Sequence, residues 1–243
     1  MKRVLPMGAT GGPFGRAWRS AVAASLAWSL TAAVALGDDS AAGKANGASE
    51  IAEAREDFLR GARLAGQSRW PEALAAFERS AALRRHAVTT FNAGVCERAM
   101  GHYALARGSF ERALTEDAAA VGKLPEVLVD DAHRYIDEID GLLAVVDVRM
   151  PSVGLQITVD ARPLWVRSPS ASPPVLVADV LPPGPGVMPP ASLFRLLVDP
   201  GAHRFALSSD GRELSAFSKE FERAAHVRVD LTVDDPAARA RLP

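Results

Sequence analysis

The strongest constraint on the fold is an internal repeat, in which residues 58–81 and 91–114 match at a shift of 33 positions. In each copy, apolar residues recur three or four positions apart on both sides of a short polar break. This spacing is typical of two helices joined by a turn. The matched positions are Phe58 and Phe91, Gly61 and Gly94, Trp70 and Tyr103, Ala73 and Ala106, and Phe77 and Phe110. A repeat of this period predicts stacked helical hairpins.

Residue size indicates how the helices of the second copy pack. Gly94 has no side chain, so we expect the two helices to cross closely there, with Ala106 opposite and Phe110 filling the space beyond. Gly101 suits a turn whose backbone angles are unfavourable for other residues. Ser68 occupies that turn position in the first copy, and we therefore expect the second copy to be the better-formed hairpin.

A further helix is predicted to begin at Pro125 and to complete a helical domain over residues 50–143. Its apolar residues follow one face: Leu124, Leu128, Tyr135, Ile139 and Leu142. Charged residues occupy the other face: Asp130, Asp131, Arg134, Asp137 and Glu138. Because two repeats alone bury too little apolar surface, we expect this helix to cap them.

The second copy resembles the tetratricopeptide repeat at Ala93-Gly94, Gly101, Tyr103, Ala106, Phe110 and Ala113. The resemblance implies that the first helix of each hairpin lines a concave groove that binds a peptide or protein partner. By this resemblance the partner-binding groove consists of Phe58, Ala62, Phe91, Val95 and Arg98. An equal alternative for Phe91 is packing against neighbouring helices or the following domain.

After Gly141 the apolar residues alternate with polar ones, a pattern typical of half-buried strands. The alternating sets are Val146, Val148 and Met150; Leu155, Ile157 and Val159; His203, Phe205 and Leu207; and Val227, Val229 and Leu231. Asp210-Gly211 is a hairpin signal. Residues 166–192 are rich in proline, which cannot donate to a strand ladder, so we expect a projecting loop. Within that loop, only Val175–Leu181 is expected to add a strand, at a sheet edge.

Three stretches of this second half resemble PEGA-type β-domains: Ile157-Thr-Val-Asp-Ala-Arg-Pro, Val198-Asp-Pro-Gly-Ala-His-Arg-Phe and His226-Val-Arg-Val-Asp-Leu. The resemblance implies a small antiparallel β-sandwich over residues 144–235, with 166–192 as an insertion and 236–243 as a tail. Ala161 stands where that family has a glycine in the first turn. The expected fold class is therefore α+β, with two domains.

Residues 1–37 have the layout of a secretory signal peptide, with basic residues before the charge-free run Ala21–Leu36. This run is shorter than the roughly 20 residues of a membrane-spanning helix, so the pattern favours export over a retained membrane anchor. Export places the protein in the periplasm or the cell envelope. The small polar residues 38–49 are expected to form a flexible linker, after which Ser49 caps a helix that begins at Glu50.

The charge of the chain limits its classes of partner. The net charge is −1, and the signal segment carries four basic and no acidic residues, so its removal changes the charge to −5. Such a chain has no generic affinity for nucleic acid. A partner is therefore expected to be a protein or peptide, or a component of the cell wall.

The sequence shows no motif that carries catalysis, because it lacks a Gly-x-Ser-x-Gly elbow and a Gly-rich phosphate loop before a helix. Asp130, His133 and Asp137 share one helix face, for which a solvated polar surface is a better explanation than a metal site. Cys96 is expected to be a small buried residue, and His203 to pack at a sheet edge. We therefore expect no catalytic, cofactor-binding or metal-binding residues and no small-molecule substrate.

These expectations lead to two functional hypotheses. The first is a non-enzymatic adaptor or scaffold of the bacterial cell envelope, which binds a protein or peptide partner on the repeat groove. The alternative is a structural envelope component whose β-domain contacts cell-wall polysaccharide or a surface layer, with the repeats as a spacer. The two hypotheses differ in which domain makes the contact.

Overall fold

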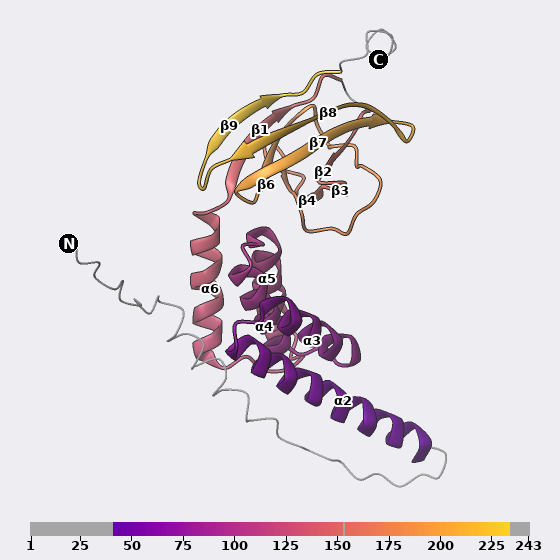
Figure 1. Ribbon diagram of the computed structural model, residues 1–243, viewed down its shortest axis with the longest axis vertical. Helices are drawn as coiled ribbons and strands as arrows, with labels where there is room; N and C mark the ends of the chain where they lie inside the picture. The colour runs from indigo at the N-terminus through magenta and orange to yellow at the C-terminus, as the bar shows by residue number, and fades with distance from the viewer. Residues whose placement is uncertain (1–40, 153, 234–243) are drawn as a thin grey trace, which may run out of the picture.

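The computed structural model describes residues 41–152 and 154–233, and this part has a helical region followed by a β-sheet region (Figure 1). The predicted α+β class is confirmed. The predicted signal peptide, residues 1–37, and the predicted tail, residues 236–243, lie outside the described residues. Among the described helices, none is long and apolar enough to cross a membrane. The helices are α2 (Ala41–Gly66), α3 (Trp70–Leu83), α4 (Ala87–Ala99), α5 (Tyr103–Ala118) and α6 (Glu126–Asp140).

Helices α2 and α3, and then α4 and α5, form two hairpins with equivalent cores. The ring centroids of Phe58 and Phe77 lie 5.6 Å apart, with the ring planes tilted by 57°. Those of Phe91 and Phe110 lie 5.3 Å apart, also tilted by 57°. Each ring pair joins the first helix of a hairpin to the second. The repeat that the sequence predicts is therefore a repeat in three dimensions.

A glycine on the first helix of each hairpin allows this close packing. A Cβ atom added at Gly61 would lie 2.8 Å from the ring of Phe77, and one at Gly94 would lie 3.0 Å from the ring of Phe110. Both distances are shorter than ordinary van der Waals contact, so a larger residue would force the ring to move. The close crossing that the sequence predicts at Gly94 is confirmed.

Both hairpin turns place one residue in the left-handed region of backbone conformation. Gly101 has a φ of +85°, as the sequence predicts, and Ser68 has a φ of 58° at the matching position. A residue with a Cβ atom adopts this conformation at a cost of about 1 kcal/mol. The first hairpin therefore keeps the geometry of the repeat despite a less suitable residue.

The first helix begins earlier than the sequence predicts. Helix α2 starts at Ala41, inside the predicted linker 38–49, and Ser49 lies within the helix instead of capping it. The Ser49 hydroxyl donates a hydrogen bond to the Glu53 carboxylate at 3.0 Å, one turn further along. Alanine, the strongest helix former, occupies four positions of this segment, and the two glycines there, Gly43 and Gly47, do not end the helix.

The strands of the described part form two sheets packed face to face. The five-stranded sheet has the order β4-β5-β6-β1-β9, and the four-stranded sheet has the order β3-β2-β7-β8. Their facing side chains share one core, to which the predicted inward residues of β1, β2, β7 and β9 contribute. The strands are β1 (Ala144–Arg149), β2 (Gln156–Val159), β3 (Arg162–Pro163), β4 (Trp165–Ser168), β5 (Val175–Val177), β6 (Leu193–Val198), β7 (Gly201–Ser209), β8 (Arg212–Phe221) and β9 (His226–Asp230).

Some expectations for this region are wrong. Strand β6, which was not predicted, lies in the middle of the five-stranded sheet, and three of the four residues of β4 lie inside the segment 166–192 that was predicted as a loop. Strand β5 lies between β4 and β6 and is not an edge strand. The five-stranded sheet is mixed, because β1 pairs with β9 and β5 with β6 in parallel. The alternation along β6 is obscured because Leu197, on its outer side, packs against the helices and is apolar too.

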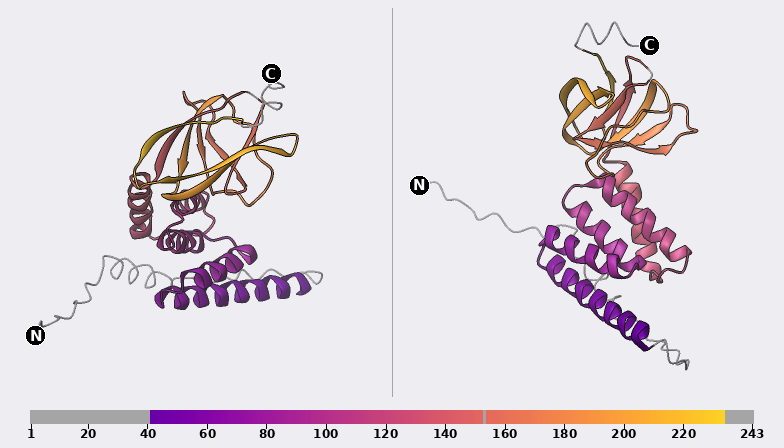
Figure 2. Two further views of the ribbon diagram at one scale, coloured as in Figure 1. Left: turned by 45° about the horizontal axis from the view of Figure 1, so that its top comes forward. Right: turned by 90° about the vertical axis from the view of Figure 1, so that its right-hand side faces the viewer.

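The helical region and the β-sheet region are in direct contact. Both views in Figure 2 place the sheets against the ends of α5 and α6, with α2 farthest from them. Val177, Val180 and Leu197 of the β-sheet region pack against the hydrophobic core of the helices. The backbone N–H of Ala104, in the first turn of α5, donates a hydrogen bond to the Asp199 carboxylate at 2.8 Å. Apolar burial and a buried hydrogen bond thus join the two regions.

Substitution of Gly61 by alanine should destabilise the protein, because the added Cβ would overlap the buried ring of Phe77. We expect the free energy of unfolding to fall by about 1–3 kcal/mol, measured by denaturant unfolding. Gly108→Ala is the matched control, since a Cβ added there meets no side chain and no other segment within 4 Å beyond its own stretch of helix. Alanine should stabilise helix α5 at that site by about 1 kcal/mol. Equal effects of the two substitutions would contradict the close crossing.

Candidate functional site

The five residues predicted to line a groove do not lie together on an open surface. Phe91 is 1% exposed, and its ring packs 5.3 Å from that of Phe110 and 6.2 Å from that of Tyr135. Phe91 therefore belongs to the core, the alternative that the sequence left open. The remaining four predicted residues are half-buried: Phe58, Ala62, Val95 and Arg98.

Arg98 holds two helices together. Its guanidinium lies 2.6 Å from both carboxylate oxygens of Glu138 on α6. It also lies over the ring of Tyr135, at 4.6 Å from the ring centroid. A cation engaged with a carboxylate and an aromatic face stabilises the packing of α4 on α6. The residue predicted as the basic rim of the groove thus has a structural role.

The structure instead shows a cleft of about 550 Å³ between α3, α4 and α5. Helix α4 lines it with Thr89, Thr90, Ala93 and Glu97. A helix turns by about 100° per residue, so these residues lie on nearly the opposite side of α4 from Phe91, Val95 and Arg98. We call this space the α3–α5 cleft. It differs from the groove that the sequence predicts.

Glu97 is the unusual residue of the α3–α5 cleft. Its side chain is 7% exposed, and its Oε2 atom has no hydrogen-bond partner among the described residues. Burial raises the pKa of this carboxyl from 4.5 to about 7, although Ser109 and Arg112 act in the opposite direction. Buried polar atoms without partners are rare in folded proteins, so this acceptor needs an explanation.

The other polar groups near Glu97 are already paired. The Thr90 hydroxyl donates to the buried Glu116 carboxylate at 2.6 Å. The Arg112 guanidinium donates to the Ser109 hydroxyl at 3.0 Å. Cys96, beside Glu97 in the sequence, is buried as predicted, and burial raises the pKa of its thiol to about 12. The cleft therefore presents one available buried acceptor, Glu97 Oε2, within its described lining.

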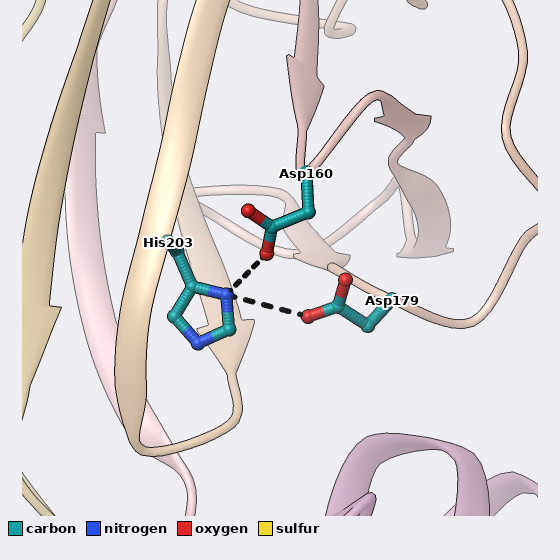
Figure 3. Close-up of side chains that lie close together, drawn as sticks. All are labelled: Asp160, Asp179 and His203. Carbon is teal, nitrogen blue, oxygen red and sulfur yellow. Dashed lines mark hydrogen bonds and ion pairs between the residues drawn. The ribbon is translucent and has the colours of Figure 1, made fainter.

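A second polar cluster lies where the β-sheet region approaches the helices. Figure 3 shows the carboxylates of Asp160 and Asp179 pointing towards the same ring nitrogen of His203. The distances from His203 Nδ1 are 2.6 Å to Asp160 Oδ2 and 3.6 Å to Asp179 Oδ2. Asp160 follows β2, Asp179 follows β5, and His203 lies on β7. Among the described residues, these three form the one group of this kind with donor atoms close enough to share a cation.

The backbone holds this cluster in place. Asp160 and Asp179 have φ values of 51° and 63°, in the left-handed region. Asp160 also accepts a hydrogen bond from the backbone N–H of Arg204 at 2.8 Å. The other ring nitrogen of His203, Nε2, lies 2.9 Å from the backbone oxygen of Asp199. Three separate segments thus fix the positions of the three side chains.

Burial also perturbs the acids around His203. It raises the pKa of Asp199 to about 6, against the opposing effect of the hydrogen bond from Ala104. It raises the pKa of Asp179 as well, while the positive charge of Arg162 lowers it. The fold therefore keeps several carboxyl groups in a poorly solvated place, which requires nearby compensating groups.

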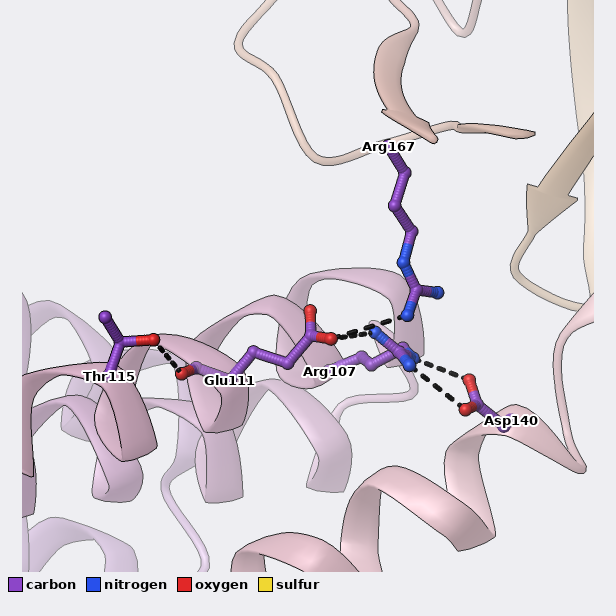
Figure 4. Close-up of polar contacts among 5 residues, drawn as sticks. All are labelled: Arg107, Glu111, Thr115, Asp140 and Arg167. Atoms are coloured by element: carbon purple, nitrogen blue, oxygen red, sulfur yellow. Dashed lines mark hydrogen bonds and ion pairs between the residues drawn. The ribbon is translucent and has the colours of Figure 1, made fainter. Parts of the chain in front are cut away.

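An ion-pair network crosses the same junction (Figure 4). The guanidinium of Arg107 on α5 lies 2.5 Å from Asp140 at the end of α6 and 2.6 Å from Glu111. Arg167 on β4 reaches Glu111 at 3.4 Å. One glutamate thus contacts both an arginine of its own helix and one of the β-sheet region.

Two of the segments that carry the polar cluster can be recognised in the sequence, but their proximity cannot. Asp160 and His203 fall in the stretches 157–163 and 198–205, which meet because β2 and β7 pair with Val159 opposite Phe205. Asp179 lies in the proline-rich segment. The group predicted from helical spacing, Asp130, His133 and Asp137, is not among the close clusters of the described residues.

No protein-family model matches this chain, and no curated protein matches it. The resemblances to known repeats and β-domains therefore depend on this chain's own residues and on its fold.

The stability of the protein should decrease as the pH rises from about 4.5 to about 7. In this interval the folded protein retains a proton on Glu97 that the unfolded chain releases, because the pKa is raised to about 7. The loss should reach about 3 kcal/mol above pH 7. Glu97→Gln should remove this pH dependence, whereas Glu78→Gln, at an exposed glutamate of the same cleft, should retain most of it, because the charge of Glu78 raises the Glu97 pKa much less than burial does. Denaturant unfolding between pH 5 and 8 measures how the free energy of unfolding changes with pH. The same pH dependence in Glu97→Gln and in the original protein would contradict the prediction.

Proposed function

We propose that this chain is an exported, non-enzymatic adaptor of the bacterial cell envelope. In this proposal the hairpins α2–α3 and α4–α5 are tetratricopeptide-like repeats that bind a protein partner. The β-sheet region is a PEGA-like domain, and residues 1–37 direct export to the periplasm. The proposal rests on the repeat geometry, on the residues that resemble the two families, and above all on the α3–α5 cleft.

The single observation that carries the proposal is the unpaired, buried Oε2 atom of Glu97. The matching residue of the first hairpin is Leu64, so the repeat itself does not require an acid there. An unpaired buried carboxylate destabilises the free protein at neutral pH. A partner that supplies the missing hydrogen bond would relieve this cost and gain affinity.

The chemistry of the cleft indicates the kind of partner. The cleft lining carries three acids, the exposed Glu78 and the buried Glu97 and Glu116, against two arginines, Arg85 and Arg112. A lysine or arginine side chain can donate to Glu97 and be attracted by the exposed acid as well. Hydrogen bonds between charged groups contribute about 1.5–3 kcal/mol. A space of about 550 Å³ is large enough for a few side chains, so the partner is proposed to insert a short basic segment.

A photo-reactive residue can locate the partner in the cells that produce the protein. Leu83 lines the cleft and is 38% exposed, so a photo-reactive side chain there should crosslink to a defined protein. Leu59 on α2 is similarly exposed, at 41%, but does not line the cleft, and it serves as the control position. Mass spectrometry identifies the crosslinked protein and the segment that lies in the cleft.

Binding of a synthetic peptide from that segment then tests the role of Glu97. Glu97→Gln keeps the size of the side chain and should weaken binding at least about tenfold, because a charge-assisted hydrogen bond is lost. Equal binding by the variant and the original protein would contradict the proposed contact. Crosslinks from both positions to the same proteins would also contradict it.

The alternative function, a β-domain that contacts cell-wall polysaccharide, is favoured by one feature. Trp165 on the edge strand β4 is 40% exposed, and an exposed aromatic ring can stack on a sugar. In that case the protein would sediment with isolated cell walls whether or not Glu97 is replaced.

A further inference from the structure

The hydrogen bonds of His203 define which of its ring nitrogens carries a proton. Nε2 lies 2.9 Å from the backbone oxygen of Asp199. A carbonyl oxygen can only accept a hydrogen bond, so Nε2 is the nitrogen that carries the proton. In the neutral ring, Nδ1 is then an acceptor with a free electron pair.

This free electron pair faces two further acceptors. Asp160 Oδ2 lies 2.6 Å from Nδ1, and Asp179 Oδ2 lies 3.6 Å from it. His203 is 8% exposed, so water screens this arrangement poorly. Three electron-rich atoms that converge in a buried place require a positive charge between them.

We propose that Asp160, Asp179 and His203 bind a divalent transition-metal cation, with Zn²⁺ as the representative ion. The metal would be coordinated by His203 Nδ1 and by one oxygen of each aspartate. Metal-binding histidines usually donate their other ring N–H to a carbonyl or carboxylate, which fixes the ring, and Asp199 has this role here. A mixed set of nitrogen and oxygen ligands suits transition metals better than Mg²⁺ or Ca²⁺, which prefer oxygen alone.

The distances are compatible with such a site. The three donor atoms lie within 4.8 Å of one another. Tetrahedral coordination with bonds of about 2.0–2.1 Å separates neighbouring ligand atoms by about 3.3 Å. Asp179 is already near that separation from Nδ1. Asp160 must move outwards by less than about 1 Å; its side chain is 36% exposed, and its other oxygen, Oδ1, accepts the hydrogen bond from the Arg204 N–H.

The position of the site suggests what the metal would do. Asp199 accepts a hydrogen bond from the His203 ring through its backbone and one from Ala104 of α5 through its carboxylate. A cation held by His203 would therefore fix the residue that joins the sheets to α5. The metal is proposed to stabilise the contact between the two regions. This role is independent of any partner in the α3–α5 cleft.

Titration of the purified, tag-free protein with Zn²⁺ after removal of metals tests the proposal. We expect one Zn²⁺ per chain in isothermal titration calorimetry. A hundredfold excess over the dissociation constant should raise the melting temperature by about 5–11 °C. Mg²⁺ at the same concentration should give no comparable shift.

The double variant Asp160→Asn/Asp179→Asn should lose this binding. Asparagine adopts the left-handed conformation as readily as aspartate, so the variant should fold with an unchanged far-ultraviolet circular dichroism spectrum. Asp210→Asn provides a matched control, because Asp210 is also an aspartate in a hairpin turn, with a φ of 49°. His226→Ala provides another, since His226 is an exposed histidine 3.2 Å from a single carboxylate, that of Asp147. Both controls should bind Zn²⁺ like the original protein.

Two results would overturn the proposal. The first is the absence of Zn²⁺ binding by the original protein, which would assign the cluster to a protonated His203 paired with two carboxylates. The second is equal binding by the double variant and the original protein, which would assign Zn²⁺ to other surface groups. A double variant that fails to fold is replaced by Asp179→Asn alone, for which at least a tenfold loss of affinity is expected.

Discussion

The arrangement of the two regions depends on Asp199. The residue that precedes helix α5, His102, does not cap the helix with its own side chain within the described structure. The carboxylate of Asp199, from the β-sheet region, accepts the hydrogen bond of the Ala104 N–H instead, at 2.8 Å. The first backbone N–H groups of a helix need such acceptors. A helix in one region is therefore completed by a side chain from the other.

The surroundings of Asp199 strengthen this contact. Val177, Val180 and Leu197 remove apolar surface from water against the helices, and Arg167 reaches across to Glu111. The buried position of Asp199 makes its charge costly, and the hydrogen bond from Ala104 offsets part of this cost. The apolar contact provides most of the favourable free energy, and the hydrogen bond fixes the relative orientation.

The two candidate sites arise from different properties of the fold. The α3–α5 cleft lies between the second helices of consecutive hairpins. It differs from an ordinary gap in packing because Glu97 places a buried carboxylate there whose Oε2 atom has no hydrogen-bond partner among the described residues. The cluster around His203 arises from the sheets, where the β2–β7 register brings Asp160 to His203. Asp199 contacts His203 and α5 at once, so the second site is coupled to the orientation of the two regions.

Much of the helical region can be predicted from the sequence, because its contacts are local and repeated. The phenylalanine and glycine positions predict the hairpin cores, and Gly101 predicts the turn. The pattern along helix α4 could not show whether Phe91 lines an exposed groove or lies in the core, because the burial of Phe91 depends on Tyr135 of α6. A helix that lines an exposed groove and a helix that packs in a core show the same spacing of apolar residues.

The β-sheet region could be predicted only where one face is polar. The alternation at β1, β2, β7 and β9 shows in the sequence, whereas the outer side of β6 is polar only at Arg195, because the helices cover the apolar Leu197. The His203 cluster could not be predicted, since its members come from three segments brought together by strand pairing and by the proline-rich segment. Its sequence signal is limited to an aspartate after one predicted strand and a histidine within another.

The central claim is that the helical hairpins and the β-sandwich form one structural unit through the contact at Asp199. Native-state hydrogen exchange tests this most directly, by comparing the slowest amides of α5 with those of β6 and β7 at increasing denaturant. If the claim is correct, both sets exchange through the same opening, with equal free energies and equal denaturant dependence. If the α5 amides exchange through a separate opening of lower free energy while β6 and β7 remain protected, the claim is contradicted.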